Sequence, residues 1–86
     1  MSTPHAETRI CWFRLFVDMK LEGWSLYDIE FELEIAKSTL IGWKDHGVEP
    51  KHADGERLIE FWSMVTAKER KDLPMEQRYP NGYRRK

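Results

Sequence analysis

The chain has 86 residues, with 14 lysines and arginines against 15 aspartates and glutamates, so its net charge at neutral pH is −1. This length fits one small domain with a hydrophobic core, and the 13% of aromatic residues supplies large side chains to fill it. The near-neutral balance lacks the basic excess that is typical of nucleic-acid-binding domains. Cys11 is the single cysteine, which excludes an internal disulfide.

No stretch approaches the roughly 20 apolar residues of a membrane-spanning helix. Residues Met1–His5 lack the charged-then-apolar pattern of a signal peptide, so we expect a cytoplasmic protein. We divide the chain into a flexible leader at residues 1–6, a helical domain at residues 7–74, and a flexible tail at residues 75–86. The tail is basic, since it carries four bases against one acid.

The segment Glu7–Leu21 is predicted to form an amphipathic helix, because its apolar residues recur at steps of three and four. The expected buried stripe consists of Ile10, Phe13, Val17 and Leu21, with Trp12 and Phe16 widening it. Gly23 follows and can adopt the left-handed backbone that ends a helix. No segment of the chain has a convincing strand pattern, so the expected fold class is all-α, with five short helices.

Two more short helices are predicted within Ser25–Trp43, joined by a tight bend. Ser25 followed three residues later by Asp28 has the pattern of a capping box. The apolar residues at helical spacing are Ile29 and Leu33 in the first helix and Leu40 and Trp43 in the second, with Ile35 between them. Helices this short are not stable alone in water, so they need the rest of the chain to pack against.

A fourth helix is predicted to start near Ala53, after the loop that contains Gly47 and Pro50. Its expected buried face consists of Leu58, Ile59, Trp62 and Val65. Thr66 followed by Glu69 has the pattern of a second capping box, which predicts a short fifth helix over Ala67–Asp72. Pro74 is then expected to end the domain.

This order of elements resembles the lambda-repressor-like helix-turn-helix family, which includes Cro, repressor and XRE-type proteins. The resemblance covers about residues 13–73 and implies a helix-turn-helix domain at residues 7–74. It rests on apolar core positions followed by an aromatic, a glycine and a proline, namely Ile29, Leu33, Ile35, Leu40, Trp43, Gly47 and Pro50.

Two glutamates depart from the pattern of that family. Glu30 stands where its members usually have alanine, and Glu34 stands where they usually have glycine. Glutamate reaches the left-handed backbone region only with strain. We therefore expect a bend of slightly different shape, or an extra helical turn, at Glu34.

The resemblance implies sequence-specific binding of double-stranded DNA by a small transcriptional regulator, of the kind that phages and prophages encode. The recognition helix would be about residues 37–45, lying in the major groove. The residues that the resemblance places at base edges are Lys37, Ser38, Thr39 and Gly42, and the expected phosphate contacts come from Tyr27, Lys44 and Lys51. A single domain with so few cations would have a low affinity for DNA, so a homodimer is also expected.

The acidic run in the second helix supports an alternative function. Its members are Asp28, Glu30, Glu32 and Glu34. These carboxylates would repel phosphates wherever they face a duplex. In the alternative, the acidic face of helix 26–34 binds a basic protein partner, such as a polymerase subunit or a nucleic-acid-binding protein.

The sequence does not predict an enzyme. The histidines His5, His46 and His52, together with Cys11, lack the paired spacing of a zinc site. Asp45 and His46 are adjacent but have no matching nucleophile. We therefore expect no catalytic residues, no metal and no cofactor.

Overall fold

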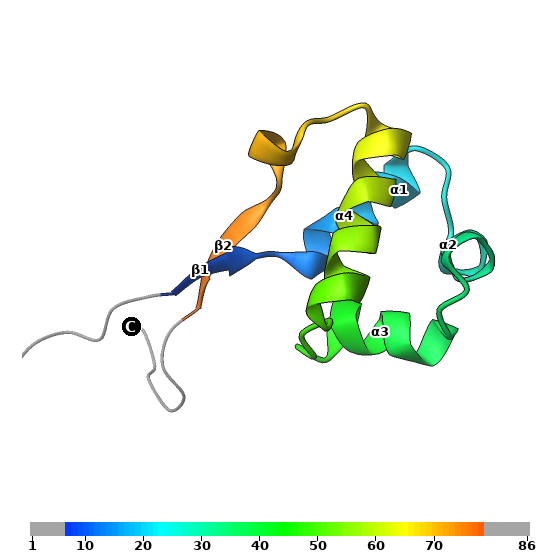
Figure 1. The fold of residues 1–86 in the computed structure, drawn as a ribbon, viewed down its shortest axis with the longest axis horizontal. Helices are drawn as coiled ribbons and strands as arrows, with labels where there is room; N and C mark the ends of the chain where they lie inside the picture. Colours follow the sequence, from blue (N-terminus) through cyan, green and yellow to red (C-terminus); the bar gives the residue numbers. More distant parts are fainter. Residues whose placement is uncertain (1–6, 79–86) are drawn as a thin grey trace, which may run out of the picture.

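The computed structural model describes residues 7–78. This part of the chain contains four α-helices, one 3-10 turn and two strands. The elements are β1 (Glu7–Ile10), α1 (Trp12–Leu21), α2 (Leu26–Leu33), α3 (Lys37–Asp45), α4 (His52–Thr66), the turn Arg70–Asp72 and β2 (Met75–Arg78). The helices form one body, and the ribbon of β1 and β2 projects from its side (Figure 1). The prediction of a predominantly helical fold is therefore confirmed. The number of helices was wrong, since residues 7–78 contain four α-helices, and so was the expected absence of strands.

β1 and β2 pair antiparallel, which joins the two ends of the described chain. Their register places Glu7 opposite Arg78 and Ile10 opposite Met75. Beside this pairing, the Cys11 amide donates to the carbonyl of Pro74 at 2.9 Å, and the Cys11 carbonyl accepts from the amide of Leu15 at 3.3 Å. Cys11 thus ends the ribbon and begins α1.

The ribbon corrects two predictions. Glu7–Leu21 is not one helix, because its first four residues form β1. Met75–Arg78 is not part of a loose tail, because it forms β2. The rest of the expected leader and tail, residues 1–6 and 79–86, lies outside the described residues.

The buried face of α1 also differs from the prediction. The residues that α1 buries are Leu15, Phe16 and Met19. Phe13 and Leu21 are exposed, and they lie on the opposite side of the helix from Leu15 because successive residues are rotated by about 100°. Since α1 carries apolar residues on both sides, its spacing alone did not determine which side packs against α3 and α4.

The predicted core of the other three helices is confirmed. Its buried members are Ile29, Leu33, Ile35, Leu40, Trp43, Leu58, Ile59 and Trp62, and the structure adds Phe61. Val65 packs against this cluster and is half-buried. Each helix presents one apolar stripe inward, so the short α2 and α3 are held by tertiary packing. No helix within residues 7–78 combines the length and apolar character needed to cross a membrane.

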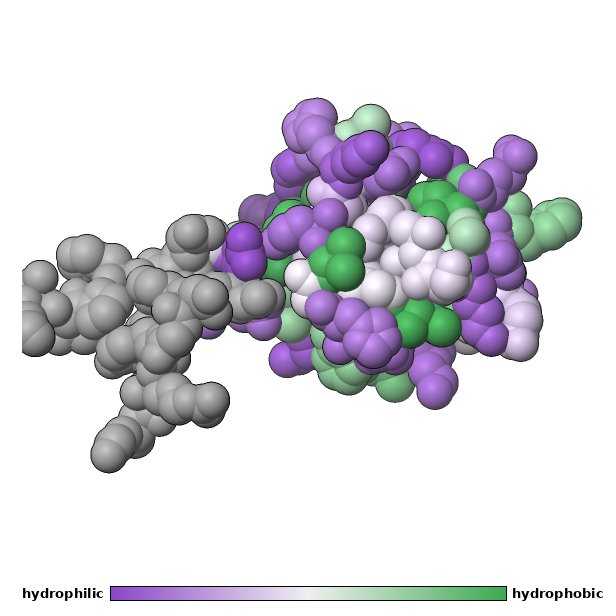
Figure 2. All heavy atoms as spheres, turned by 90° about the horizontal axis from the view of Figure 1, so that it is seen from below, coloured by the Kyte–Doolittle hydropathy of each residue, from purple (hydrophilic) through white to green (hydrophobic). Residues whose placement is uncertain are grey.

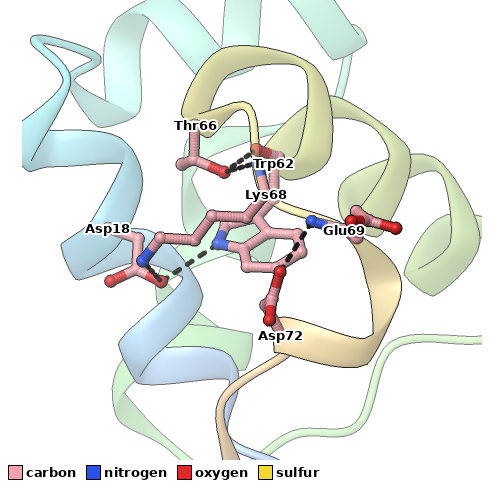
Figure 3. Close-up of polar contacts among 6 residues, drawn as sticks. All are labelled: Asp18, Trp62, Thr66, Lys68, Glu69 and Asp72. Atoms are coloured by element: carbon pink, nitrogen blue, oxygen red, sulfur yellow. Dashed lines mark hydrogen bonds and ion pairs between the residues drawn. The ribbon is translucent and has the colours of Figure 1, made fainter.

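A polar cluster joins α1 to the end of α4 (Figure 3). The indole nitrogen of Trp62 donates to Oδ2 of Asp18 at 3.0 Å. The Lys68 ammonium lies 3.7 Å from the same carboxylate oxygen. The Thr66 hydroxyl donates back to the Trp62 carbonyl at 2.6 Å. The buried indole therefore has a hydrogen-bond acceptor, and that acceptor is paired with a cation.

The helical segment after α4 is a 3-10 turn, which is shorter and more tightly wound than the predicted fifth helix. Ala67 adopts the left-handed conformation, with φ of 58°, and ends α4. The expected capping box at Thr66 is absent, because the box is formed by Glu69 and Asp72 around a 3-10 turn, Arg70–Asp72. The prediction of a helix over Ala67–Asp72 was therefore wrong in its start and its type.

The capping box at the start of α2 is confirmed. The Asp28 amide donates to the Ser25 hydroxyl at 3.2 Å, and the Ser25 amide donates to Oδ2 of Asp28 at 2.9 Å. The Ser25 hydroxyl also donates to Oδ2 of Asp28 at 2.9 Å. The hydrogen bonds that this carboxylate accepts from the Ser25 amide and hydroxyl hold the pKa of Asp28 below its usual value. Asp28 thus stays charged at the positive end of α2, where a negative charge stabilises the helix.

The bend between α2 and α3 passes through a left-handed glutamate. Glu34 has φ of 56° and ψ of 42°, and its amide donates to the Glu30 carbonyl at 2.8 Å. The expectation that Glu34 would avoid this region through a different bend or an extra turn was wrong. The glutamate adopts the conformation for which the family resemblance implies glycine.

Glu34→Gly is expected to stabilise the domain. Relief of the left-handed strain at this position favours glycine by roughly 1–2 kcal/mol. The greater conformational freedom of glycine in the unfolded chain offsets part of this stabilisation, so the free energy of unfolding should rise by about 0.5 kcal/mol. Urea unfolding followed by circular dichroism measures the change. The matched control is Glu60→Gly, at an exposed position within α4, which should lower the stability by about 1 kcal/mol. A loss of stability in both variants would contradict the left-handed bend.

Candidate nucleic-acid interface

The helix α3 lies on the lower edge of the helical body in Figure 1. Leu40 and Trp43 anchor it in the core, whereas Ser38 and Thr39 are exposed. Figure 2 views the molecule from that side, where the centre of the surface is pale and weakly polar, with separate green patches and purple side chains around it. The exposed side of α3 therefore offers short hydroxyl side chains in weakly polar surroundings.

A cleft with three lysines lies beside this surface, and we call it the lysine cleft. Its lysines are Lys20 of α1 and Lys37 and Lys44 of α3, and the start of α2 supplies Ser25, Leu26 and Tyr27. The cleft measures about 290 Å³, and its remaining lining consists of apolar side chains from α1, α2 and the segment between them. Three lysine side chains and the first residues of α2 thus line one hollow, and the lysines give it a positive charge.

Lys37 is held at the edge of this cleft by two contacts to α2. Its ammonium lies 3.7 Å from the centre of the Tyr27 ring, a cation–π contact. Its amide donates to Oε2 of Glu30 at 2.9 Å. Lys37 therefore extends along α2, whereas Ser38 and Thr39 are open to solvent.

Lys44 lies one helical turn beyond Leu40, and its charge is shared with a neighbour. Its ammonium is 3.0 Å from Oδ1 of Asp45 and 5.4 Å from the centre of the Phe13 ring. Lys44 is half-buried and Asp45 is exposed, and ion pairs that remain in contact with solvent contribute little to stability. Lys44 can therefore exchange Asp45 for another anion at small cost.

The two other expected contact residues lie apart from the lysine cleft. Gly42 packs under Val48, and a Cβ there would lie 3.6 Å from Cγ2 of Val48, an ordinary van der Waals distance. Lys51 is exposed in the segment before α4 and does not line the cleft. The structure thus brings Tyr27, Lys37 and Lys44 together, and it leaves Gly42 and Lys51 outside this cluster.

The acidic run of α2 is divided among different surfaces. Asp28 caps its own helix, and Glu30 accepts from the first amide of α3. Glu32 lines a groove against α4, and Glu34 forms the bend. Only Glu30 among the four contacts α3 through an observed hydrogen bond, and there its carboxylate is used as a helix cap. The departure of Glu30 from the family pattern therefore has a structural reason.

Lys20 is the residue of this cluster that sequence reasoning missed. It stands at the end of α1, seventeen positions before Lys37 in the chain. No local motif connects two lysines at that separation, because their proximity depends on how α1 packs against α3. A correct assignment of the buried face of α1 would have been needed to find it.

The described residues contain no group of three or more histidine, cysteine or acidic side chains placed to hold a metal ion. The hydroxyls of Ser38 and Thr39 can donate to or accept from base edges, and the lysines can neutralise phosphates. No protein-family model, characterised protein or solved structure matches this chain.

Proposed function

We propose that this protein binds double-stranded DNA in a sequence-specific manner, with α3 in the major groove, as a small transcriptional regulator of the lambda-repressor-like helix-turn-helix type. The observation that carries the proposal is the arrangement of α3, which presents Ser38 and Thr39 outward next to a cleft with three lysines. An exposed helix flanked by cations has the features needed to lie in the major groove between two phosphate backbones.

The proposed roles follow from the position of each side chain. Ser38 and Thr39 contact base edges, since their hydroxyls are exposed on α3. Lys37 contacts a phosphate in preference to guanine, because its ammonium lies over the Tyr27 ring in the free protein. Lys44 and Lys20 contact phosphates from the same cleft. This assignment moves Lys37 from the base-reading group, where the family resemblance had placed it, to the phosphate group.

We further propose that the protein binds DNA as a homodimer. Three cleft lysines give a single domain a small electrostatic contribution, because each neutralised phosphate adds only one salt-dependent increment. A two-fold dimer doubles the contacts and reads two half-sites about one helical turn of DNA apart. Analytical ultracentrifugation with and without a duplex measures the oligomeric state of the protein. A strict monomer on DNA would contradict the dimer.

The test is a selection from random duplexes, followed by binding measurements on the enriched sequence and on a scrambled duplex. The variant Ser38→Ala/Thr39→Ala is expected to lower the preference for the enriched sequence by roughly 10- to 100-fold, since a good base contact contributes about 1–3 kcal/mol. Its affinity for the scrambled duplex should change little, because phosphates carry non-specific binding.

The matched control is Thr8→Ala/Gln77→Ala, which removes two exposed polar side chains that face each other across the ribbon. This control should leave the preference unchanged. If the selection enriches no sequence, the proposed function is wrong. If the ribbon variant loses the preference and the α3 variant keeps it, the assignment of α3 is wrong.

A further inference from the structure

A second surface of the protein, which meets the lysine cleft at Trp24, exposes large apolar side chains. Phe31 of α2 is 81% exposed, and Met64 of α4 is 70% exposed. Beneath them, Trp24 and Phe61 pack edge to face with ring centres 5.0 Å apart. Contiguous apolar surface of this kind commonly marks a binding site for another protein.

Two hollows adjoin on this surface. One is a groove of about 290 Å³ between α2 and α4, with Leu33, Phe61 and Met64 in its lining. The other measures about 390 Å³ and is lined by Trp24 and Phe31 among others. Glu32 lines both hollows, so they are neighbours on one surface. We call it the α2–α4 face, and its defining residues are Trp24, Phe31, Glu32, Glu60, Phe61 and Met64.

The charge of the α2–α4 face is negative. Asp28, Glu32 and Glu60 line its hollows, against one base, Arg57. Arg57 is already engaged, since its guanidinium donates to the Leu33 carbonyl and lies 3.9 Å from Oδ1 of Asp54. Asp28 stays ionised because its hydrogen bonds with Ser25 lower its pKa. The face therefore combines apolar centres with acidic side chains.

We propose that the α2–α4 face is a docking site for a cationic amphipathic helix of a protein partner. The apolar hollows take the hydrophobic stripe of such a helix, and Glu32 and Glu60 pair with its lysines or arginines. A second copy of this chain is a poor occupant, because a two-fold contact sets the same acidic residues against each other. Charge complementarity thus favours a basic partner over self-association.

Docking on this face is compatible with DNA binding by α3. Successive residues of α2 are rotated by about 100°, so Glu32 lies on the side opposite to Tyr27. Tyr27 contacts Lys37 on the α3 side, and Glu32 lines the groove against α4. Trp24 lines both the lysine cleft and one hollow of the face. A partner therefore leaves the lysine cleft open when it docks along Glu32 and Glu60, on the side toward α4.

The test uses a synthetic leucine–lysine amphipathic peptide of about 18 residues, or about five helical turns. Titration into the ¹⁵N-labelled protein should give saturable shifts of amides in α2 and α4, with a dissociation constant in the micromolar range. The variants Phe31→Ser and Glu32→Lys should each weaken binding at least several-fold. Leu21→Ser is the matched control, since Leu21 is 79% exposed on α1, outside the face, and it should bind as the unmodified protein does.

The outcomes separate the alternatives. Absence of saturable binding, or equal losses in Phe31→Ser and Leu21→Ser, would overturn the docking site. Equal binding of a leucine–glutamate peptide would overturn the role of charge. A concentration-dependent dimer that Phe31→Ser abolishes would show that the occupant is a second copy. DNA affinity in Phe31→Ser should equal that of the unmodified protein, so failure of the docking site and failure of DNA binding are distinguishable.

Discussion

Trp62→Ala is expected to lower the free energy of unfolding by about 3–5 kcal/mol. Trp62 is fully buried at the centre of the core, and its removal leaves a cavity that the surrounding helices cannot fill. A domain of this size has a total stability of roughly 4–13 kcal/mol. The loss is therefore a large fraction of the total stability, and urea unfolding followed by circular dichroism measures it.

The matched control is Trp24→Ala, because Trp24 is half-buried at the edge of the core. Its loss should be clearly smaller than that of Trp62→Ala. Trp62→Phe tests the hydrogen bond to Asp18, since phenylalanine keeps most of the apolar volume and removes the donor. Asp18 retains Lys68 as a partner. We therefore expect Trp62→Phe to lower the free energy of unfolding by less than Trp62→Ala does. A greater loss in Trp24→Ala than in Trp62→Ala would contradict this description of the core.

Replacing the three cleft lysines by glutamine, in Lys20→Gln/Lys37→Gln/Lys44→Gln, is expected to weaken DNA binding by ~100-fold at low salt. The loss should be similar for the selected and scrambled duplexes, because phosphates carry no base identity. The slope of log affinity against log salt should become shallower by about 2–3 units, since three phosphate contacts are removed. Fluorescence anisotropy with a labelled duplex at several salt concentrations measures both quantities.

Two single variants provide the matched comparison for the lysine cleft. Lys20→Gln and Lys71→Gln each remove one charge from an exposed lysine. Lys71 lies in the 3-10 turn Arg70–Asp72, and that turn is on the upper side of the molecule in Figure 1, whereas α3 is on the lower side. Lys20→Gln should reduce the salt slope by about 1 unit, and Lys71→Gln should reduce it little. Equal reductions would mean that net charge, and not the cleft, governs binding.

Local sequence patterns determined the middle of this fold. The Ser25–Asp28 capping box and the apolar spacing of Ile29, Leu33, Leu40 and Trp43 were predicted and are present. These features depend on residues within one or two helical turns of each other, so neighbouring side chains are sufficient to specify them. The same holds for the inward face of α4, where Leu58, Ile59 and Trp62 are buried.

Several predictions failed where partners lie far apart in the sequence. Two others failed locally, because Glu34 and Ala67 adopt the left-handed backbone that their residue types disfavour. β1 exists because Glu7–Ile10 pairs with Met75–Arg78, and a four-residue strand has too little local pattern to be recognised alone. The buried side of α1 depends on its contacts with α3 and α4, since both sides of that helix are apolar.

The candidate site shows the same division between local and tertiary information. The family resemblance, and not the local pattern of α3, predicted that Lys37, Ser38 and Thr39 face outward. Ser38 and Thr39 are exposed, whereas Lys37 is half-buried. By contrast, packing of α1 brought Lys20 to Lys37, and the bend at Glu34 brought Glu30 to the amide of Lys37. The Ser25–Asp28 capping box and the inward stripes of α2, α3 and α4 depend on short-range patterns, so the sequence by itself determined them. The strand pairing, the inward side of α1 and the lysine cleft arise only when distant segments pack together, and the tertiary structure decided them.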